Sequence, residues 1–216
     1  LWPAPGPAQD GSLEEIEVTG SRIARRDFTS ASPIVSVPAE AFRESSSVSV
    51  ERTLGQLPQF VPTATGTSNS PTNDGQANLS LRGIGSVQTL VLVDGKRLMP
   101  ADGLGTVDLN VLPPALIESV EVVTGGASAA YGSDAIAGVV NFRLRDRFEG
   151  VELHGEWTQT ERGDGREYSA GILAGSSFAA GRGDVIAYLG YAEREQVNQD
   201  ERGFSRHAWG YFPGET

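Results

Sequence analysis

Three glycine-punctuated blocks in a fixed order decide the fold of this chain: LSLRGIG at residues 79–85, LVLVDGKRL at 90–98 and VEVVTGGASAAYGSDAIAGVVNFRL at 120–144. Glycine adopts backbone conformations that other residues avoid, so its recurrence beside short apolar runs favours brief strands joined by tight turns. The pattern does not favour long helices. This region therefore predicts a small sheet with short helical turns between its strands.

The first two blocks predict strands and a hairpin. Asn78–Arg82 alternates in polarity and ends at Gly83, where the missing side chain permits a bulge or a close backbone approach. Leu90–Val93 is apolar on both faces, which is typical of a strand that is covered on both sides. Asp94-Gly95 suits a two-residue turn with positive φ at both positions, so Lys96–Met99 is the expected partner strand.

The third block predicts two strands around a helical turn. Pro113 starts a turn that leads into the strand Ser119–Thr124, and the small residues Ala127–Ala130 allow a tight helical turn close to the sheet. One face of the final strand carries Val140, Phe142 and Leu144. The glycines at 125 and 126 do not indicate a phosphate-binding loop, because no Gly-Lys-Ser/Thr sequence follows them.

Upstream of these blocks, the sequence predicts a strand, two short helices and a loop. Pro33–Val37 favours a strand, and Pro38 suits the first position of a brief helix through Phe42. Val50–Leu57 places apolar side chains at i, i+4 and i+7 and ends before a proline, which predicts a second helix. Pro62–Ala77 contains no large side chain and is expected to be an exposed loop.

From Val151 onward the pattern changes to long alternation. Val151–Thr158 and Tyr168–Phe178 each alternate apolar with polar side chains, and Val185–Glu193 does so less regularly. The alternation predicts three antiparallel strands with one apolar and one polar face. In a soluble sandwich the polar face would contact water, whereas in a membrane barrel it would line the lumen.

Composition and charge exclude several classes of function. The net charge of −11 argues against nucleic acid as a partner, because phosphate binding needs clustered Lys and Arg. Cysteine is absent, which excludes a disulfide framework and a thiolate metal site. His154 and His207 are isolated and form no ligand pair, so neither a metal nor another cofactor is expected. No apolar run approaches the length of about 18 residues that a membrane-spanning helix needs.

The order of the three blocks, preceded by EEIEVTG at 14–20 and followed by the alternating strands, resembles the plug domain of TonB-dependent outer-membrane transporters. The resemblance implies an α+β plug domain at 33–147, a small mixed sheet with short helices. The first antiparallel strands of a transmembrane β-barrel are expected at 148–216. Residues 12–32 would form a flexible leader, and residues 1–11 are interpreted as the remnant of an export signal. We expect a fragment, because the chain lacks an initiator Met and the barrels of the family have about 22 strands.

The resemblance also implies roles for individual residues. The leader would carry the TonB box, the peptide that the inner-membrane energy-coupling protein binds as an added strand. It comprises Glu15, Ile16, Glu17, Val18, Thr19 and Gly20. Arg82 matches a plug arginine that pairs with carboxylates of the barrel wall, although a solvated arginine at a strand end is the alternative. Thr124-Gly125-Gly126 stands where the commoner pattern has Arg-Gly-Pro, which leaves a second ion pair of this kind unsupported.

The implied function is active uptake of a scarce small molecule across the bacterial outer membrane, with the plug in the barrel lumen and the TonB box facing the periplasm. The barrel would contact outer-membrane lipid. The two candidate apical loops, Thr63–Ala77 and Met99–Thr106, contain no Lys, Arg or aromatic residue. The predicted substrate contacts are Asn69, Thr72, Asn73, Asp74 and Asp102. A carbohydrate or another polar nutrient therefore suits these loops as well as an iron chelate does.

Three other functions are alternatives to uptake. A surface-structural or adhesin-type outer-membrane protein without transport is the main alternative. A signalling receptor would need a further folded domain before Glu14, and only a short segment precedes that residue. An enzyme is not expected: Ser128, Ser133, Asp134 and His154 are the residue types of a hydrolase triad, but no GxSxG sequence accompanies them.

Overall fold

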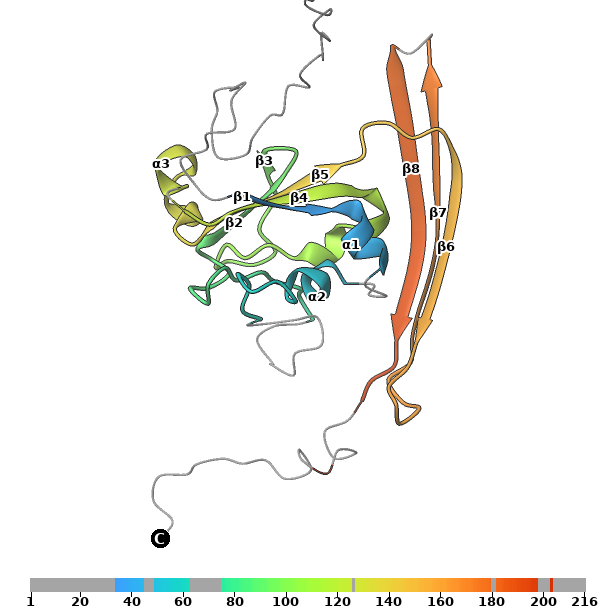
Figure 1. Cartoon of the computed structure of the whole chain (residues 1–216), viewed down its shortest axis with the longest axis horizontal. Coiled ribbons are helices and arrows are strands. Elements are labelled where there is room, and N and C mark those ends of the chain that lie inside the picture. Colours follow the sequence, from blue (N-terminus) through green and yellow to red (C-terminus); the bar gives the residue numbers. More distant parts are fainter. Residues whose placement is uncertain are drawn as a thin grey trace, which may run out of the picture.

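The computed structural model describes residues 34–44, 49–62, 75–125, 127–179, 182–197 and 203. A five-stranded mixed sheet with short helices lies beside a separate three-stranded antiparallel sheet (Figure 1). We call residues 34–144 the mixed-sheet domain and residues 150–194 the three-stranded sheet. Within the described ranges, no helix has both the length and the apolar character required to cross a membrane.

The strands of the mixed-sheet domain are β1 (Ile34–Pro38), β2 (Thr89–Val93), β3 (Lys96–Arg97), β4 (Ile117–Val123) and β5 (Gly138–Leu144). They lie in the order β1-β4-β5-β2-β3, and only the β2–β5 pair is parallel. The helical elements are α1 (Ala39–Glu44), α2 (Val50–Leu54) and α3 (Ser128–Tyr131), with 3-10 turns η1 (Leu109–Val111), η2 (Pro114–Leu116) and η3 (Ser133–Ala135). This architecture confirms the predicted α+β class.

Both faces of the mixed sheet are covered. One face packs against α1, α2 and the turn η1, and Phe142 is fully buried there. The other face packs against α3 and η3 through a smaller cluster that contains Val139. Strand β2 contributes to both clusters, because Val91 points to the first and Leu90 and Leu92 point to the second. Burial on both faces explains why this strand is apolar throughout.

The three glycine blocks interlock where β5 begins. Gly138 has a φ of +140°, and a Cβ atom there would lie 2.2 Å from the Val123 carbonyl oxygen and 2.9 Å from Leu81 Cδ1. Only glycine fits such a contact without displacing the backbone. Beside it, the Arg82 guanidinium donates to the Ala137 carbonyl oxygen at 2.8 Å. The first and third blocks therefore hold each other in place.

The predicted Asp94-Gly95 hairpin is confirmed. Both residues have positive φ, 47° and 73°. The turn is also bonded to β5, since the Leu144 N–H donates to Asp94 Oδ1 at 3.1 Å and the Gly95 N–H donates to Asn141 Oδ1 at 2.9 Å. The partner strand is shorter than predicted, because only Lys96 and Arg97 pair with β2.

Two predictions near the first block were wrong in part. Helix α2 ends at Leu54 rather than Leu57, because turns from Gly55 redirect the chain toward a single bridge between Phe60 and Leu81. Asn78–Arg82 is not a strand of the sheet: its backbone bonds to a turn, as in the 2.8 Å bond from the Arg82 N–H to the Gln59 carbonyl oxygen, and to a side chain, as in the 3.1 Å bond from the Leu81 N–H to Thr89 Oγ1. Alternating polarity cannot distinguish a sheet strand from such an extended segment.

The predicted exposed loop Pro62–Ala77 also needs a correction at its end. Residues 63–74 lie outside the described parts of the chain, but Ala77 is fully buried. Its N–H donates to Asp108 Oδ1 at 2.9 Å, and its carbonyl oxygen accepts from the Leu109 N–H at 2.9 Å. These bonds hold the end of the loop in the core.

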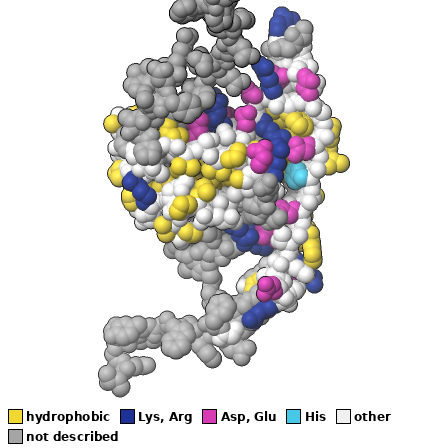
Figure 2. Space-filling view, in the orientation of Figure 1, with side chains coloured by type: hydrophobic (Ala, Val, Ile, Leu, Met, Phe, Trp, Pro, Cys, Tyr) yellow, Lys and Arg dark blue, Asp and Glu magenta, His cyan; other side chains and the backbone are white. Residues whose placement is uncertain are grey.

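The three predicted alternating strands are confirmed as β6 (Gly150–Thr158), β7 (Glu167–Phe178) and β8 (Gly183–Arg194), paired in chain order. One face, which we call the inner face, lies toward the mixed-sheet domain. Figure 2 shows charged side chains gathered where the two parts meet and hydrophobic side chains along the outer edge of the sheet. The exposed apolar residues of the outer face include Val151, Leu153, Trp157, Ile172, Phe178, Val185 and Leu189.

Candidate functional site

Most of the predicted site residues lie outside the described parts of the chain. These are the TonB-box residues Glu15, Ile16, Glu17, Val18, Thr19 and Gly20 and the loop residues Asn69, Thr72, Asn73 and Asp74. Their roles stay predictions. The structure places the two others, Asp102 and Arg82, and both use their side chains within the mixed-sheet domain.

Asp102 binds its own loop. Oδ1 of its carboxylate accepts from the backbone N–H groups of Leu104 at 2.9 Å and Thr106 at 3.1 Å, and Oδ2 accepts from the Thr106 hydroxyl. The hydroxyl bond and these backbone bonds lower the pKa of Asp102 below its usual value. The carboxylate therefore shapes the loop, and its prediction as a substrate contact stays untested.

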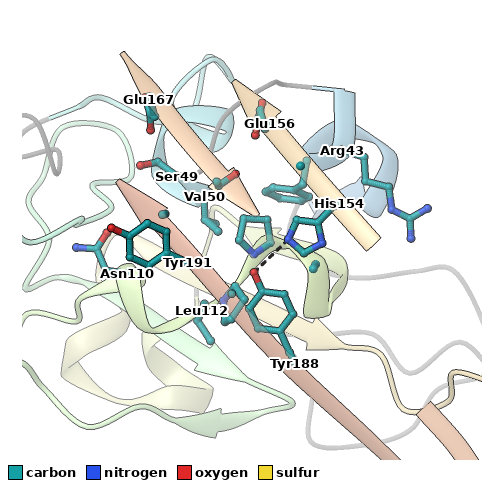
Figure 3. Close-up of a pocket in the computed structure, with 18 of the residues that line it drawn as sticks. Arg43, Ser49, Val50, Asn110, Leu112, His154, Glu156, Glu167, Tyr188 and Tyr191 are labelled. Carbon is teal, nitrogen blue, oxygen red and sulfur yellow. Dashed lines mark hydrogen bonds between the residues drawn. The ribbon is translucent and has the colours of Figure 1, made fainter. Parts of the chain in front are cut away.

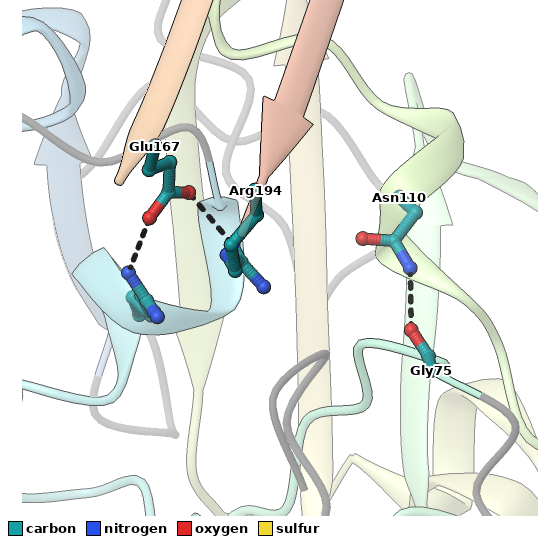
Figure 4. A network of polar contacts seen from close by, with 5 residues as sticks. Gly75, Asn110, Glu167 and Arg194 are labelled. Atoms are coloured by element: carbon teal, nitrogen blue, oxygen red, sulfur yellow. Dashed lines mark hydrogen bonds and ion pairs between the residues drawn. The ribbon is translucent and has the colours of Figure 1, made fainter. Parts of the chain in front are cut away.

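The described end of the first predicted apical loop, residues 75–77, lies beside the second loop and η1, and we call this surface the platform. Asn110 Nδ2 donates to the Gly75 carbonyl oxygen at 3.0 Å (Figure 4), and the Thr106 hydroxyl lies 3.3 Å from Gln76 Oε1. On this platform Met99 and Leu104 are 88% and 75% exposed. Sequence reasoning noted the polar groups of these loops and missed the two apolar side chains, which stand out in an otherwise polar segment.

Arg82 has a positive φ of 54° and donates to the carbonyl oxygen of Ala137 and, at 3.5 Å, to that of Ile136. Among the residues that the structure describes, no carboxylate pairs with it. Its predicted pairing with the barrel wall stays a prediction. Its visible role is to connect the first and third glycine blocks.

A cavity of about 790 Å³ separates the mixed-sheet domain from the inner face of the three-stranded sheet (Figure 3). The domain contributes mainly apolar side chains together with Arg43, Ser49 and Asn110, and the sheet contributes mainly polar ones. The apolar group comprises Phe42, Val50, Leu112, Pro113 and Pro114, and the polar group includes Glu152, His154, Glu156, Ser169 and Tyr188. A volume of this size suits a small molecule or a file of water molecules.

His154 and Tyr188 form the centre of the polar side of the cavity. Their rings stack with centroids 5.5 Å apart and planes 4° apart, and His154 Nε2 lies 3.2 Å from the Tyr188 hydroxyl (Figure 3). His154 Nδ1 is buried and has no hydrogen-bond partner within the described structure. Nowhere in the described ranges do three or more His, Cys, Asp or Glu side chains gather to hold a metal ion.

Ion pairs join the two parts beside the cavity. Glu167 of β7 accepts from Arg52 of α2 at 3.1 Å and from Arg194 of β8 at 2.7 Å (Figure 4). Arg145, which follows β5, donates to Glu152 of β6 at 3.0 Å. Sequence reasoning missed these pairs. The alternation of β7 indicates that Glu167 faces opposite to Tyr168, toward the domain, but it does not identify Arg52 as the partner.

The four residues with the chemistry of a hydrolase triad are not assembled. Ser133 donates to Asp134 at 3.1 Å, and Asp134 pairs with Arg97, which lowers the pKa of the Asp134 carboxyl. His154 lies on the three-stranded sheet and contacts Tyr188 instead. The geometry therefore shows no hydrolase triad among these four residues.

A comparison with protein-family models decides the family. The model described as the TonB-dependent Receptor Plug Domain matches residues 26–139, more than half of the chain. The chain belongs to the TonB-dependent receptor plug family. Receptors, not enzymes, define this family. From here on, we call the mixed-sheet domain the plug.

Solved structures share the fold over most of this chain. The siderophore receptor PirA from Pseudomonas aeruginosa is 23% identical with a TM-score of 0.55, covering 77% of this chain and 30% of that one. A mutant of the ferric enterobactin receptor PfeA from the same species, in complex with enterobactin, is 23% identical with a TM-score of 0.59, covering 79% and 26%. The unliganded ferric citrate transporter FecA is 21% identical with a TM-score of 0.59, covering 76% and 26%.

The chain thus spans less than a third of the length of these receptors. At such identities the likeness concerns the fold. The three strands β6–β8 that follow the plug are consistent with the start of a barrel.

Proposed function

We propose that this chain is the plug and the first wall strands of a receptor that takes up a scarce small molecule across the bacterial outer membrane. One observation carries the proposal. A plug of this family lies against an antiparallel sheet whose inner face is polar and whose outer face is apolar. Such a sheet suits lipid on one side and a plugged lumen on the other.

The energy for uptake would come from a TonB-type coupling protein in the inner membrane. The leader segment at 15–20 alternates in polarity and can add as a strand to an exposed sheet edge of that protein. The leader runs into β1, which lies at the edge of the plug sheet and pairs only with β4. Force on the leader would therefore act first on an edge strand with a single partner in the described sheet.

The substrate would bind on the platform formed by the loops at 63–77 and 99–106. The similar receptors are described as binding siderophores or, in the case of FecA, transporting ferric citrate. The loops of this chain contain no Lys or Arg and present Met99 and Leu104 to solvent. An iron chelate with apolar groups and an uncharged nutrient such as a carbohydrate both suit this surface.

A substitution in the leader tests the proposal. Val18→Pro removes a backbone donor from the added strand, whereas Val18→Thr keeps the donor and the preference for extended structure. In cells that express the full-length receptor, radiolabelled ferric citrate, ferric enterobactin and an oligosaccharide mixture serve as probes. Val18→Pro should abolish import of the accepted probe and leave its binding at the cell surface unchanged, and Val18→Thr should import it.

Two outcomes would contradict the proposal. Import by Val18→Pro at the wild-type rate would remove the leader as the coupling segment. Wild-type import that is unchanged in cells lacking the coupling protein would contradict the energy coupling.

A further inference from the structure

Small residues follow one another on the inner face of β7 and β8. Ser169 and Gly171 are successive inward residues of β7, and their cross-strand neighbours on β8 are Ala192 and Gly190. The next inward residue of β7, Leu173, is fully buried. The four small residues therefore leave a hollow in the inner face. Ser169, Gly190 and Ala192 of this hollow line the cavity between the plug and the sheet.

Two aromatic side chains, which we call the ring pair, lie across the hollow. His154 of β6 is the cross-strand neighbour of Gly171, and Tyr188 lies two residues before Gly190 on the same face of β8. A Cβ atom at Gly171 would collide with the His154 ring, and one at Gly190 would collide with the Tyr188 ring. The two glycines thus allow both rings to lie along the sheet, with their planes 4° apart (Figure 3).

Polar groups of both hydrogen-bonding kinds border the ring pair. Glu156 lies two residues after His154 on the same face of β6 and is the cross-strand neighbour of Ser169. Its carboxylate supplies acceptors, and the Ser169 hydroxyl can both donate and accept. His154 Nδ1 is buried and has no partner among the residues that the structure describes. One polar atom of the ring pair is therefore unsatisfied, which is rare in a protein interior.

The plug faces the ring pair with apolar groups. Leu112, Pro113 and Pro114 line the cavity from the plug side. The cavity is open to solvent, and its volume of about 790 Å³ has room for a small molecule and its water. A ligand in it would therefore meet an apolar wall on one side and aromatic rings with polar neighbours on the other.

The charges around the cavity favour an uncharged ligand. Glu152 is paired with Arg145. Glu156 and Arg43 also line the cavity, and within the described ranges neither forms an ion pair. These two carry opposite charges, so the cavity presents no clear excess of either sign to a charged ligand.

We propose that the cavity is a binding site for a small, uncharged ring compound with several hydroxyl groups, such as a monosaccharide. One C–H face of the sugar ring packs on His154 and Tyr188, and its hydroxyl groups bond to Glu156 and Ser169. The apolar plug wall packs on the opposite face of the sugar. The site is separate from the platform, and the inference does not rest on the proposed uptake function.

Binding of methyl β-D-glucopyranoside to the purified full-length receptor tests the site. The receptor is kept in lauryldimethylamine oxide, a detergent without a sugar group, and saturation-transfer NMR measures the dissociation constant. Tyr188→Ala removes one ring and should weaken binding about three- to tenfold. Ser169→Leu fills the hollow and should abolish binding. The anionic methyl glucuronide and the cationic glucosamine should bind several-fold more weakly than the neutral probe.

Ala170→Leu is the matched control for Ser169→Leu. Ala170 is the next residue of β7 and lies on the outer face, so the same side chain is added outside the cavity. Binding should stay at the wild-type affinity. Each variant must show the heat-modifiable gel mobility of a folded barrel, and Tyr188→Ala decides the question where Ser169→Leu does not fold.

Several results would overturn the proposal. The site is absent if the wild-type receptor does not bind the neutral probe, or if folded Ser169→Leu and Tyr188→Ala both bind it with wild-type affinity. Lower thermal stability without weaker binding in Tyr188→Ala would mean that the ring pair only covers the glycines. Loss of binding in Met99→Glu alone would place the sugar on the platform. Equal affinity for the charged analogues would overturn the ligand class.

These measurements use no coupling protein and no membrane transport. Failure of the sugar site would therefore leave the uptake proposal standing. Failure of the coupling experiment with Val18→Pro would likewise leave the binding results valid.

Discussion

The interior of the plug and its boundary with the three-stranded sheet are held together by different means. Inside the plug, Gly138 lies against Val123 and Leu81 with no room for a side chain, and Phe142 is fully buried. At the boundary, a cavity of about 790 Å³ lies beside ion pairs. Within the described part of 150–194, only Glu167 and Leu173 are buried. Steric fit thus determines the fold of the plug, and ion pairs determine its position against the three-stranded sheet.

The largest effect should come from filling the contact where the glycine blocks meet. Gly138→Ala places a Cβ atom 2.2 Å from the Val123 carbonyl oxygen at a φ of +140°. Backbone strain and overpacking together should cost about 3 kcal/mol or more in plug stability. Hydrogen exchange of β4 and β5 amides in the full-length receptor measures this loss.

Gly103→Ala is the control for this substitution. A Cβ atom at Gly103 would meet nothing within 4 Å, and its φ lies outside the positive range. The exchange rates of β4 and β5 should stay at the wild-type level. Protection in Gly138→Ala as strong as in the control would contradict the interlocking of the blocks.

A second pair of substitutions compares the two regions directly. Phe142→Ala empties a fully buried site and should destabilise the plug by about 3–5 kcal/mol, again measured by hydrogen exchange of β4 and β5. His154→Ala, on the cavity side of the sheet, should change plug stability by less than about 1 kcal/mol, because His154 is half-buried and stacks on Tyr188 of the sheet rather than on the plug core. Similar losses in both variants would mean that the boundary is packed like the core.

A local effect is expected in the loop at 99–106. The pKa of Asp102 is lowered in the folded loop. Its hydrogen bonds therefore stabilise the loop fully at pH values above the ordinary pKa of 3.8, and this stabilisation is lost as the pH falls through the lowered pKa of the folded loop. A nitroxide label at residue 104 should stay ordered at neutral pH and become mobile only when the pH falls below 3.8, through the lowered pKa of Asp102. With Asp102→Asn, the label should be mobile at neutral pH already, and equal order in both variants would remove this role.

The smallest effect concerns the surface of the plug. Arg97 pairs with Asp134, and both side chains are about half exposed. Solvent screens such pairs, so Arg97→Ala should destabilise the plug by less than about 1 kcal/mol. Thermal unfolding of the full-length receptor at low and high salt checks this value. A larger loss would show that the bond from Arg97 to the Tyr131 carbonyl oxygen also stabilises the plug.

Local sequence patterns predicted the elements whose contacts are local. Asp94-Gly95 identified its hairpin because positive φ at both positions restricts the residue choice. The apolar run at 90–93 identified a strand covered on both faces, and long alternation identified β6–β8. Asn78–Arg82 was assigned wrongly because its backbone bonds to the turn residue Gln59 and to the Thr89 hydroxyl, and a period of two does not reveal what an extended segment bonds to.

The candidate site was less accessible to sequence reasoning. Arg52 and Glu167 are 115 residues apart, and each is unremarkable in its local context. Only the tertiary position of α2 beside the start of β7 brings them together. Asp102 was predicted as a substrate contact from its residue type, yet its carboxylate bonds to Leu104 and Thr106 of its own loop. Composition identifies polar loops, and geometry decides which polar groups are already used.

The most direct test of the account asks whether β6 and β8 have one lipid face and one plug face. The experiment uses the full-length receptor in lipid vesicles and places nitroxide labels on both faces of the sheet. Leu153 and Leu189 are the outer positions, and His154 and Tyr188 are the inner ones. The labels report collisions with dissolved oxygen, which concentrates in lipid. The account predicts frequent collisions at residues 153 and 189 and few at 154 and 188. Equal collision rates at neighbouring positions, or the reverse alternation, would contradict it.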